Sequence, residues 1–343
     1  MSDIRVNNIT NRGGNGGTVI AGITTVSSNT FMVVPSGTTE ARSAGSGRGV
    51  ITSGSTPSSM IADMEYVNIA STGDAQDFGD LQVATHFPSS SASSTRGLNV
   101  GGFSPTGGVN YNNLIEYITI SSQGGSFDFG DLRTMHYAGT GFSNETRGLH
   151  AGGQRASSTY NTFAEYITIT TKGRTSFFGS LTASSNQNQM ASFSSPTRGV
   201  CSNGVGSALI EFCTIATLGD FTKFGEMSVI KHMSDGGFSS NTRGIFAGGY
   251  SPTLTALQNS MESVEIATLG NGVDFGDLNN TTQQLSSTSN KIRGIISGGE
   301  TPSTINVIDF VMISTRGNAF DFGDLTTARR AHTSFSDAHG GIQ

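Results

Sequence analysis

An arginine and an acidic residue recur together along this sequence, and ionisable groups of opposite sign are the first candidates for chemistry. The arginine precedes a glycine, as in RGLNVGG from Arg96, and the acid opens an alternating run, as in EYITIS from Glu116. Such groups could act as acids and bases, form a charged ring, or pair with one another. Because each recurs six times in fixed order, we expect the arginine and the acid to pair on adjacent strands and hold the fold.

Three signatures carry the repeated residues, and they follow one another along the chain. The arginines of the first signature are Arg48, Arg96, Arg147, Arg198, Arg243 and Arg293. The acids of the second signature are Glu65, Glu116, Glu165, Glu211, Glu262 and Asp309. The third signature is DFGDL or a variant, centred on Phe78, Phe129, Phe178, Phe224, Phe275 and Phe322.

Histidines and aspartates near these signatures are of the residue types that could bind a metal ion. His86, His136, His232 and His332 lie near the starts of segments that could gather around an axis, but two repeats lack the histidine. A metal ring would need converging imidazoles held by further partners. The tight DFGDL turns offer two carboxylates each, whereas calcium takes six or more oxygens. We therefore predict no metal site and expect the DFGDL acids to cap their own turns.

The spacing of the repeat predicts the architecture that must position these residues. Successive arginines are 45–51 residues apart, and each unit contains strand-like runs. That period fits the four strands of a propeller blade. With 47 Gly and only 13% charged residues, the composition favours turns and short strands over helices. We predict an all-β, six-bladed propeller over residues 39–343.

The order of strands within each repeat can also be predicted. The segment before Arg-Gly is the innermost strand, and the Arg-Gly segment comes second. The acidic run is third, and DFGDL is the outer strand, with its Phe packed between blades. The ring is expected to close through the C-terminal segment SFSDAHGGIQ, although TEARSAGSG before Arg48 could take the same place.

This order of features resembles the kelch-type propeller family over about residues 40–343. The resemblance lies in a strand ending Gly-Gly, then a strand with an acidic and an aromatic residue, then an outer strand with one large aromatic. Here Phe stands where kelch blades usually carry Trp, so the resemblance implies the four-stranded blade more firmly than the kelch loops.

Residues 1–38 lack all three signatures and form a predicted attachment or oligomerisation arm. Their short β-prone runs, such as TVIAGITTV and TFMVVPSG, bury little surface alone and need a partner. The arm followed by TRG and DFGDL repeats resembles virion structural proteins of tailed phages of marine bacteria. That resemblance implies a tail fibre or decoration protein located in the virion and assembled in the host cytoplasm.

Catalysis finds little support in the motifs. The sequence has no GxSxG turn, no phosphate-binding glycine loop and no HExxH helix. We predict a non-enzymatic protein with no catalytic residues and no cofactor. The alternative is a polysaccharide-active enzyme with a carboxylate pair in the propeller funnel. The kelch resemblance also implies a second enzymatic alternative, a galactose-oxidase-like enzyme. That chemistry would require Tyr and His ligands and a Tyr–Cys crosslink.

Loops that differ among the repeats are the candidate ligand-binding surface. Those after Gly-Gly and those entering the inner strand should emerge on the same face, because strands alternate in direction. Tyr111, Tyr160 and Tyr250 lie in these loops and could stack on sugars or contact proteins. Ordinary loop packing is the alternative for each tyrosine.

Charge and hydropathy limit the partners. A net charge of −6 argues against nucleic acid, and no apolar run is long enough to insert into a membrane. The N-terminus does not read as a secretory signal. We expect contacts with other virion proteins through residues 1–38, with a host surface glycan or protein, and with further copies of this chain, a trimer being one option. Cys201 and Cys213 lie on neighbouring predicted strands, so a disulfide and two buried thiols both remain open.

Overall fold

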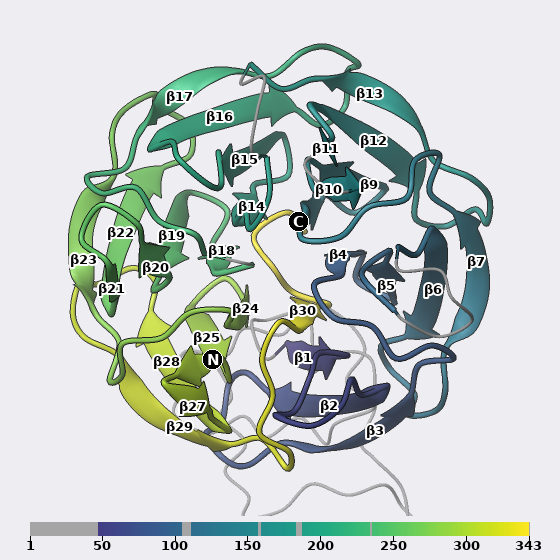
Figure 1. Cartoon of the computed structure of the whole chain (residues 1–343), viewed down its shortest axis with the longest axis horizontal. Helices are drawn as coiled ribbons and strands as arrows, with labels where there is room; N and C mark the ends of the chain where they lie inside the picture. The colour runs from purple at the N-terminus through teal and green to yellow at the C-terminus, as the bar shows by residue number, and fades with distance from the viewer. Residues whose placement is uncertain (1–46, 105–110, 157–158, 183–186, 234, 343) are drawn as a thin grey trace, which may run out of the picture. The chain divides into compact units, whose positions relative to one another are not determined.

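A computed structural model describes residues 47–104, 111–156, 159–182, 187–233 and 235–342. Within these residues every regular element is a strand, and six four-stranded antiparallel sheets follow one another around a ring (Figure 1). The protein is therefore a six-bladed β-propeller, as predicted. The predicted arm, residues 1–38, lies outside the described residues.

The first three blades are given from the axis outward. Blade 1 consists of β30 (Thr333–Ser336), β1 (Arg48–Thr52), β2 (Asp63–Asn68) and β3 (Gln76–Asp80). Blade 2 consists of β4 (Ser89–Ala92), β5 (Arg96–Val100), β6 (Leu114–Thr119) and β7 (Phe127–Asp131). Blade 3 consists of β8 (Thr140–Ser143), β9 (Arg147–Ala151), β12 (Phe163–Thr168) and β13 (Ser176–Ser180).

The other three blades repeat the same order. Blade 4 consists of β14 (Ser192–Ser194), β15 (Arg198–Ser202), β16 (Leu209–Thr214) and β17 (Thr222–Glu226). Blade 5 consists of β18 (Gly237–Ser239), β19 (Arg243–Ala247), β22 (Ser260–Glu265) and β23 (Val273–Asp277). Blade 6 consists of β24 (Ser286–Ser289), β25 (Arg293–Ser297), β28 (Val307–Met312) and β29 (Phe320–Asp324).

Strand alternation gives the ring two different faces. The short turns that follow the first and third strands, such as 93–95 and 120–126, lie on one face, which we call the turn face. The longer connections that follow the second and fourth strands, such as 298–306 and 132–139, lie on the other, which we call the loop face.

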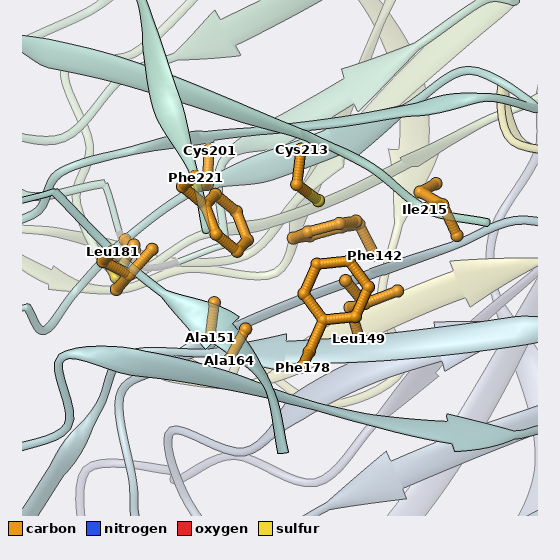
Figure 2. Packing of buried hydrophobic residues seen from close by; sticks show 11 residues of the cluster. Phe142, Leu149, Ala151, Ala164, Phe178, Leu181, Cys201, Cys213, Ile215 and Phe221 are labelled. Carbon is orange, nitrogen blue, oxygen red and sulfur yellow. The ribbon is translucent and has the colours of Figure 1, made fainter. Parts of the chain in front are cut away.

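Apolar side chains fill the spaces between blades. The space between blades 3 and 4 holds Phe178 from the outer strand β13, together with Leu149 from β9 and Cys201 and Cys213 from β15 and β16 (Figure 2). Phe178 packs edge-on against Phe221 with ring centroids 6.2 Å apart. Each of the other five DFGDL phenylalanines is buried in an equivalent cluster. Both faces of each blade sheet are thus covered by its neighbours, as such stacked sheets require.

The outer strands are joined into a belt by backbone contacts between blades. Gly79 in β3 has a φ of 135°, and a Cβ on it would lie 2.5 Å from the carbonyl oxygen of Gly124 in blade 2. The same approach places Gly124 N 2.8 Å from Phe78 O and Ser126 N 2.9 Å from Asp80 O. Glycine is required here because the backbones meet without room for a side chain.

The DFGDL acids were predicted to cap their own turns, but in blades 5 and 6 the side chain that caps the outer strand comes from the next blade. The backbone N–H of Asp324 donates to Asp74 Oδ1 at 3.1 Å, and that of Asp277 donates to Asn318 Oδ1 at 3.0 Å. In these blades the DFGDL residue supplies the donor and a side chain of the following blade supplies the acceptor.

The repeated acids join each blade to the one before it. Glu116 accepts from the backbone N–H of Gln82, at the end of blade 1, at 2.6 Å and from Ser126 Oγ at 2.7 Å. The other acids accept the backbone N–H of the residue at the same position of the preceding blade. These pairs are Thr326–Glu65, Arg133–Glu165, Thr182–Glu211, Ser228–Glu262 and Asn279–Asp309.

The repeated arginines join each blade to the one after it. Arg96 donates through Nη1 to Ile169 O in blade 3 at 2.9 Å, while its guanidinium lies 4.5 Å from the ring centroid of Tyr117 in its own blade. Arg48, Arg147, Arg198 and Arg293 make the same two contacts. Cation–π contact and a charge-assisted hydrogen bond therefore replace an ion pair.

The predicted pairing of arginine with acid inside a blade is wrong. Arg96 lies opposite Thr119, and Glu116 lies opposite Asn99, so the two charged residues are three positions apart along the strands. At about 3.3 Å per residue this separation is roughly 10 Å. Both sets of residues are structural, but they connect neighbouring blades instead of each other.

Serine hydroxyls on the inner strands form a ladder around the axis. Ser194 Oγ donates to Ser143 O at 2.6 Å, Ser239 Oγ to Ser194 O at 2.7 Å, and Ser289 Oγ to Ser239 O at 2.7 Å. Ser336 and Ser143 continue the ladder to either side. Among the described residues, a hollow of about 50 Å³ lies beside these hydroxyls on the axis. Small polar side chains at these positions let six strands approach one centre.

The C-terminal segment closes the ring. β30 pairs antiparallel with β1, so the prediction that the C-terminal segment completes blade 1 is confirmed. The next residues cross the middle of the turn face (Figure 1), where a Cβ on Gly341 would lie 1.9 Å from Ser143 O. His339 Nε2 lies 3.0 Å from the carbonyl oxygen of Ala92, the position where the other inner strands carry serine.

Removal of the Glu116 carboxylate should destabilise the protein. Glu116→Ala removes the buried acceptor of the Ser126 hydroxyl and the nearer of the two acceptors of the Gln82 N–H, which should cost about 1–3 kcal/mol in the free energy of unfolding. Chemical denaturation measures this loss. Asp131→Ala, which changes an exposed acid of the same blade, is the control and should change stability by less than about 0.5 kcal/mol. Equal stabilities of the two variants would contradict the assigned role of Glu116.

The titration of the buried Asp235 carboxyl group should be visible in the pH dependence of stability. Asp235 is buried near the axis, accepts from Thr333 Oγ1 of the closing strand, and has its pKa raised to about 7 by burial. Its folded-state pKa lies above its unfolded value of 3.8, so its contribution is complete below pH 3.8 and lost as the pH rises through 7. Asp235→Asn cannot titrate, and its melting temperature relative to wild type should rise between pH 4 and 7 and then level off. Parallel curves for the two proteins would exclude this titration.

Candidate ligand-binding site

The loop face is built from short hairpins that continue the second and third strands. They include β10 (Gln154–Ala156) with β11 (Thr159–Tyr160), β20 (Tyr250–Ser251) with β21 (Ala256–Leu257), and β26 (Glu300–Thr301) with β27 (Ser303–Thr304). In blade 2 a bridge joins Phe103 and Tyr111 at the corresponding place. In five blades a residue near the end of the incoming connection forms a bridge with the start of the loop after the second strand, as His86 does with Phe103.

Aromatic rings gather where the hairpins of blades 2 and 3 meet. Tyr111 lies 5.4 Å from Tyr137 and 6.2 Å from Phe103, and Phe103 lies 5.9 Å from Tyr137. His86 and Phe87 extend the group through ring contacts of 5.0 Å to Phe103 and 6.3 Å to Tyr137. We call these five residues the aromatic cluster. Each of them is partly exposed to solvent.

The cluster combines apolar rings with polar groups. Tyr137 donates its hydroxyl to Gln154 Oε1 at 2.9 Å, which fixes the ring over the β10 hairpin. The pKa of Tyr137 is raised by burial and by the neighbouring hydroxyls of Tyr111 and Tyr160. The pKa of His86 is lowered to about 4 by burial and by Arg330, so this imidazole is neutral at pH 7. Partly exposed rings with hydroxyl edges can bind ligands that are apolar on one side and polar on the other.

The fold does not require aromatic residues at these positions. In blade 6 Glu300 and Thr304 form the same hairpin pair, and Gln283 makes the same bridge as His86. The bridges are made by the backbone, so the side chains are free to vary. The backbone of the loop face therefore does not fix aromatic residues between blades 2 and 3.

The three tyrosines predicted from the sequence are only partly brought together. Tyr111 belongs to the aromatic cluster, and Tyr160 lies near enough to Tyr137 to raise its pKa. Tyr250 lies in blade 5, where its ring contacts His232 at 5.9 Å. Sequence analysis missed Phe87, Phe103 and Tyr137 as surface residues. Their position beside the variable loops was visible in the sequence, but the bridges that group them were not.

The four histidines weighed as metal ligands have separate surroundings. His136 and His332 are buried, with Nδ1 of His136 near Thr134 O and Nε2 of His332 near Ser297 Oγ. Burial lowers the pKa of His332 to about 3 and also lowers that of His136. In the described part of the chain, no group of three or more His, Cys, Asp or Glu residues could hold a metal ion.

The two cysteines are free thiols buried between blades 3 and 4. Cys201 faces Glu211 in the strand register and Cys213 faces Gly199, so the cysteines are diagonal neighbours on one sheet. Burial raises the pKa of Cys213 to about 12 and raises that of Cys201 as well. Both thiols are protonated at pH 7 and pack as small apolar groups.

Comparisons with known proteins leave the surface itself as the guide to function. The chain matches no protein-family model, and a search of curated proteins gives no match to it either. Among the described residues, no helix is both long and apolar enough to span a bilayer.

Proposed function

We propose that this protein is a non-enzymatic display protein whose loop face binds a ligand through the aromatic cluster. The observation that supports this is the group of five partly exposed rings at positions where the equivalent backbone of blade 6 carries polar residues. Solvent-exposed rings that the fold does not need are typical of recognition surfaces.

A saccharide is the ligand class that fits this surface best. The C–H faces of a sugar ring pack on aromatic rings, and its hydroxyls need polar partners at the ring edges. Tyr111 and Tyr137 offer both, and the amide of Gln154 lies beside the Tyr137 hydroxyl. A neutral His86 at the edge of the cluster adds a further hydrogen-bonding group without a charge.

For the biological setting, we propose a structural protein of a phage virion that contacts the host surface. The support is the resemblance of the repeats and of residues 1–38 to virion proteins of tailed marine phages. In this proposal residues 1–38 attach the chain to other virion proteins or to further copies of itself. The propeller presents the loop face outward. Copy number per particle distinguishes a fibre or baseplate protein, with a few dozen copies or fewer, from a decoration protein with hundreds.

The enzymatic alternative has less support from the described residues. The six repeated acids, the most regular carboxylates of the chain, accept backbone N–H groups between blades. They are therefore held as structural acceptors and do not form a carboxylate pair in the funnel. Release of sugar from host envelope glycans on incubation with the protein would reverse this assignment.

Binding to host-surface glycans should depend on the aromatic cluster. Tyr111→Ala and Tyr137→Ala each remove a partly exposed ring and should weaken binding about tenfold, equivalent to about 1.4 kcal/mol. Glycan-array binding and titration with the best glycan measure this change. Tyr250→Ala removes a ring from the same face in blade 5 and is the matched control, which should bind like wild type. Equal binding by all four proteins would refute the aromatic cluster as the ligand site.

A further inference from the structure

The propeller contains an internal example of a carboxylate bound at the turn face. In blade 2 the turn 93–95 precedes Arg96, and Ser94 at its centre donates from its backbone N to Glu145 Oε2 at 3.2 Å and Oε1 at 3.3 Å. Ser94 Oγ donates to the same carboxylate at 2.5 Å. Glu145 comes from the corresponding turn of blade 3. This turn of one blade therefore forms a seat for a carboxylate supplied by the next blade.

Blade 5 has the same turn but lacks this carboxylate. Asn241 occupies the position of Ser94, and Lys291 of blade 6 occupies the position of Glu145. Between them is a hollow of about 410 Å³, a size within the range of small-molecule sites. Its walls include Asn241, Thr242, Arg243, Glu265 and Lys291. A cation has thus replaced the anion, and the turn beside it keeps the backbone N–H but carries an amide in place of the Ser94 hydroxyl.

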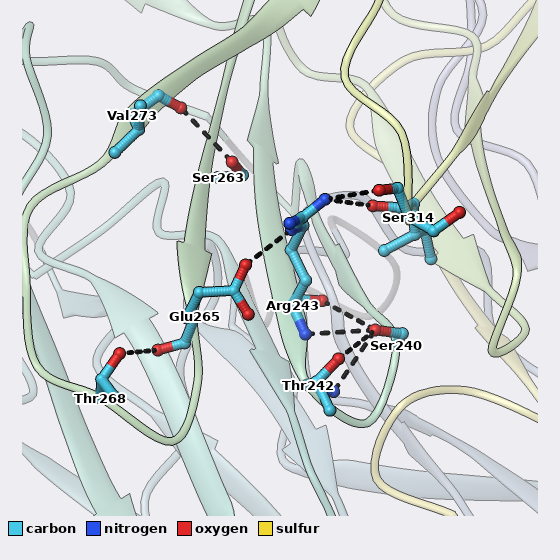
Figure 3. Close-up of polar contacts among 9 residues, drawn as sticks. Ser240, Thr242, Arg243, Ser263, Glu265, Thr268, Val273 and Ser314 are labelled. Atoms are coloured by element: carbon cyan, nitrogen blue, oxygen red, sulfur yellow. Dashed lines mark hydrogen bonds and ion pairs between the residues drawn. The ribbon is translucent and has the colours of Figure 1, made fainter.

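Arg243 differs from the other repeated arginines. Ser263 stands where blade 2 carries Tyr117, so the guanidinium lacks the ring of its own blade. Its Nε donates to Glu265 Oε1 at 2.9 Å, and its Nη1 donates to Ile313 O at 3.1 Å and Ser314 O at 2.9 Å (Figure 3). Among the described residues, Nη2 has no acceptor, so two N–H groups remain available on the wall of the hollow.

We propose that this hollow binds the carboxylate of an acidic sugar, such as a hexuronate. The backbone N–H of Asn241 takes the role that Ser94 has toward Glu145. The Arg243 Nη2 and the Lys291 ammonium supply positive charge, which offsets the free-energy cost of removing a carboxylate from water. The exposed Thr242 hydroxyl suits a hydroxyl of a sugar ring, whereas the Ser240 hydroxyl is held inside the turn, where it accepts from the backbone N–H groups of Thr242 and Arg243.

The charges around the hollow favour an anion over a neutral ligand. Arg243 and Lys291 face it against one carboxylate, Glu265, which is already paired with Arg243. Arg316 lies on the other side of Glu265, in an adjoining hollow that shares this residue. The site is therefore locally positive in a protein of net charge −6. It lies on the turn face, so it is separate from the aromatic cluster and does not rest on the function proposed for that cluster.

Titration with small carboxylates tests this proposal. Glucuronate, glucose and acetate are added to the full-length protein at low ionic strength, and binding is followed by isotope-edited NMR of backbone amides. Glucuronate should bind and shift the Asn241 amide, with affinity falling as salt is raised. Glucose should bind at least about tenfold more weakly because it lacks the charge.

Charge-reversal variants locate the site. Lys291→Glu places a carboxylate where Glu145 stands in blade 3, and this carboxylate should occupy the seat in cis and abolish glucuronate binding. Lys223→Glu makes the same charge change on the exposed outer strand of blade 4 and should bind like wild type. Lys291→Gln keeps the seat open without the cation and should weaken binding at least about fivefold. Unchanged melting temperatures show that the three variants are folded.

Three results would overturn the proposal. Binding of glucuronate that Lys291→Glu leaves unchanged would place the anion elsewhere. Equal affinities for glucuronate and acetate would exclude recognition of a sugar. Equal affinities for glucuronate and glucose would exclude recognition of the carboxylate.

Discussion

The structure depends on one constraint, which is that no blade satisfies all of its own backbone groups. A four-stranded sheet has two faces and two edges, and alone it would leave apolar faces and backbone donors exposed to water. Here the N–H after each outer strand is accepted by an acid of the following blade, and the carbonyl after each third strand is bound by an arginine of the preceding blade. The glycine–glycine belt at the rim and the serine ladder at the axis also join each blade to its neighbours through backbone groups. Stability is therefore a property of the closed ring.

Much of this fold could be predicted from the sequence, because six recurrences of three signatures leave few architectures. The number of blades, the strand order, the burial of the DFGDL phenylalanines and the closing role of the C-terminal segment are confirmed. The roles of the arginines and acids were mispredicted. A sequence shows that Arg96 and Glu116 occur together, but only the register shows that they lie at different heights of the sheet. Contacts between blades join residues far apart in the chain, and a pattern within one repeat does not reveal them.

The candidate sites could be predicted only where they break the repeat. Tyr111 and Tyr160 stand in loops that differ from blade to blade, so they were visible. The grouping of Tyr137 with Tyr111 and Phe103 could not be predicted, because Tyr137 comes from the next connection along the chain and only the fold brings it beside them. Likewise, Lys291 is an ordinary surface lysine in the sequence. Its position is recognised as part of a candidate site only because Glu145, the equivalent residue of blade 3, is bound to the turn of the neighbouring blade. Repeats thus provide an internal reference against which exceptional residues stand out.

The pairing of β30 with β1 has a consequence for synthesis of the chain. The inner edge of β1 stays without its partner until residues 333–336 have left the ribosome, after about 280 further residues. At typical translation rates of about 5–20 residues per second this interval lasts roughly 15–55 s. During that time Val50 and Ile51 belong to an open sheet edge that can pair with other nascent chains. Newly made protein is therefore most vulnerable to aggregation before its last strand appears, and chaperones that shield strand edges would act in this window.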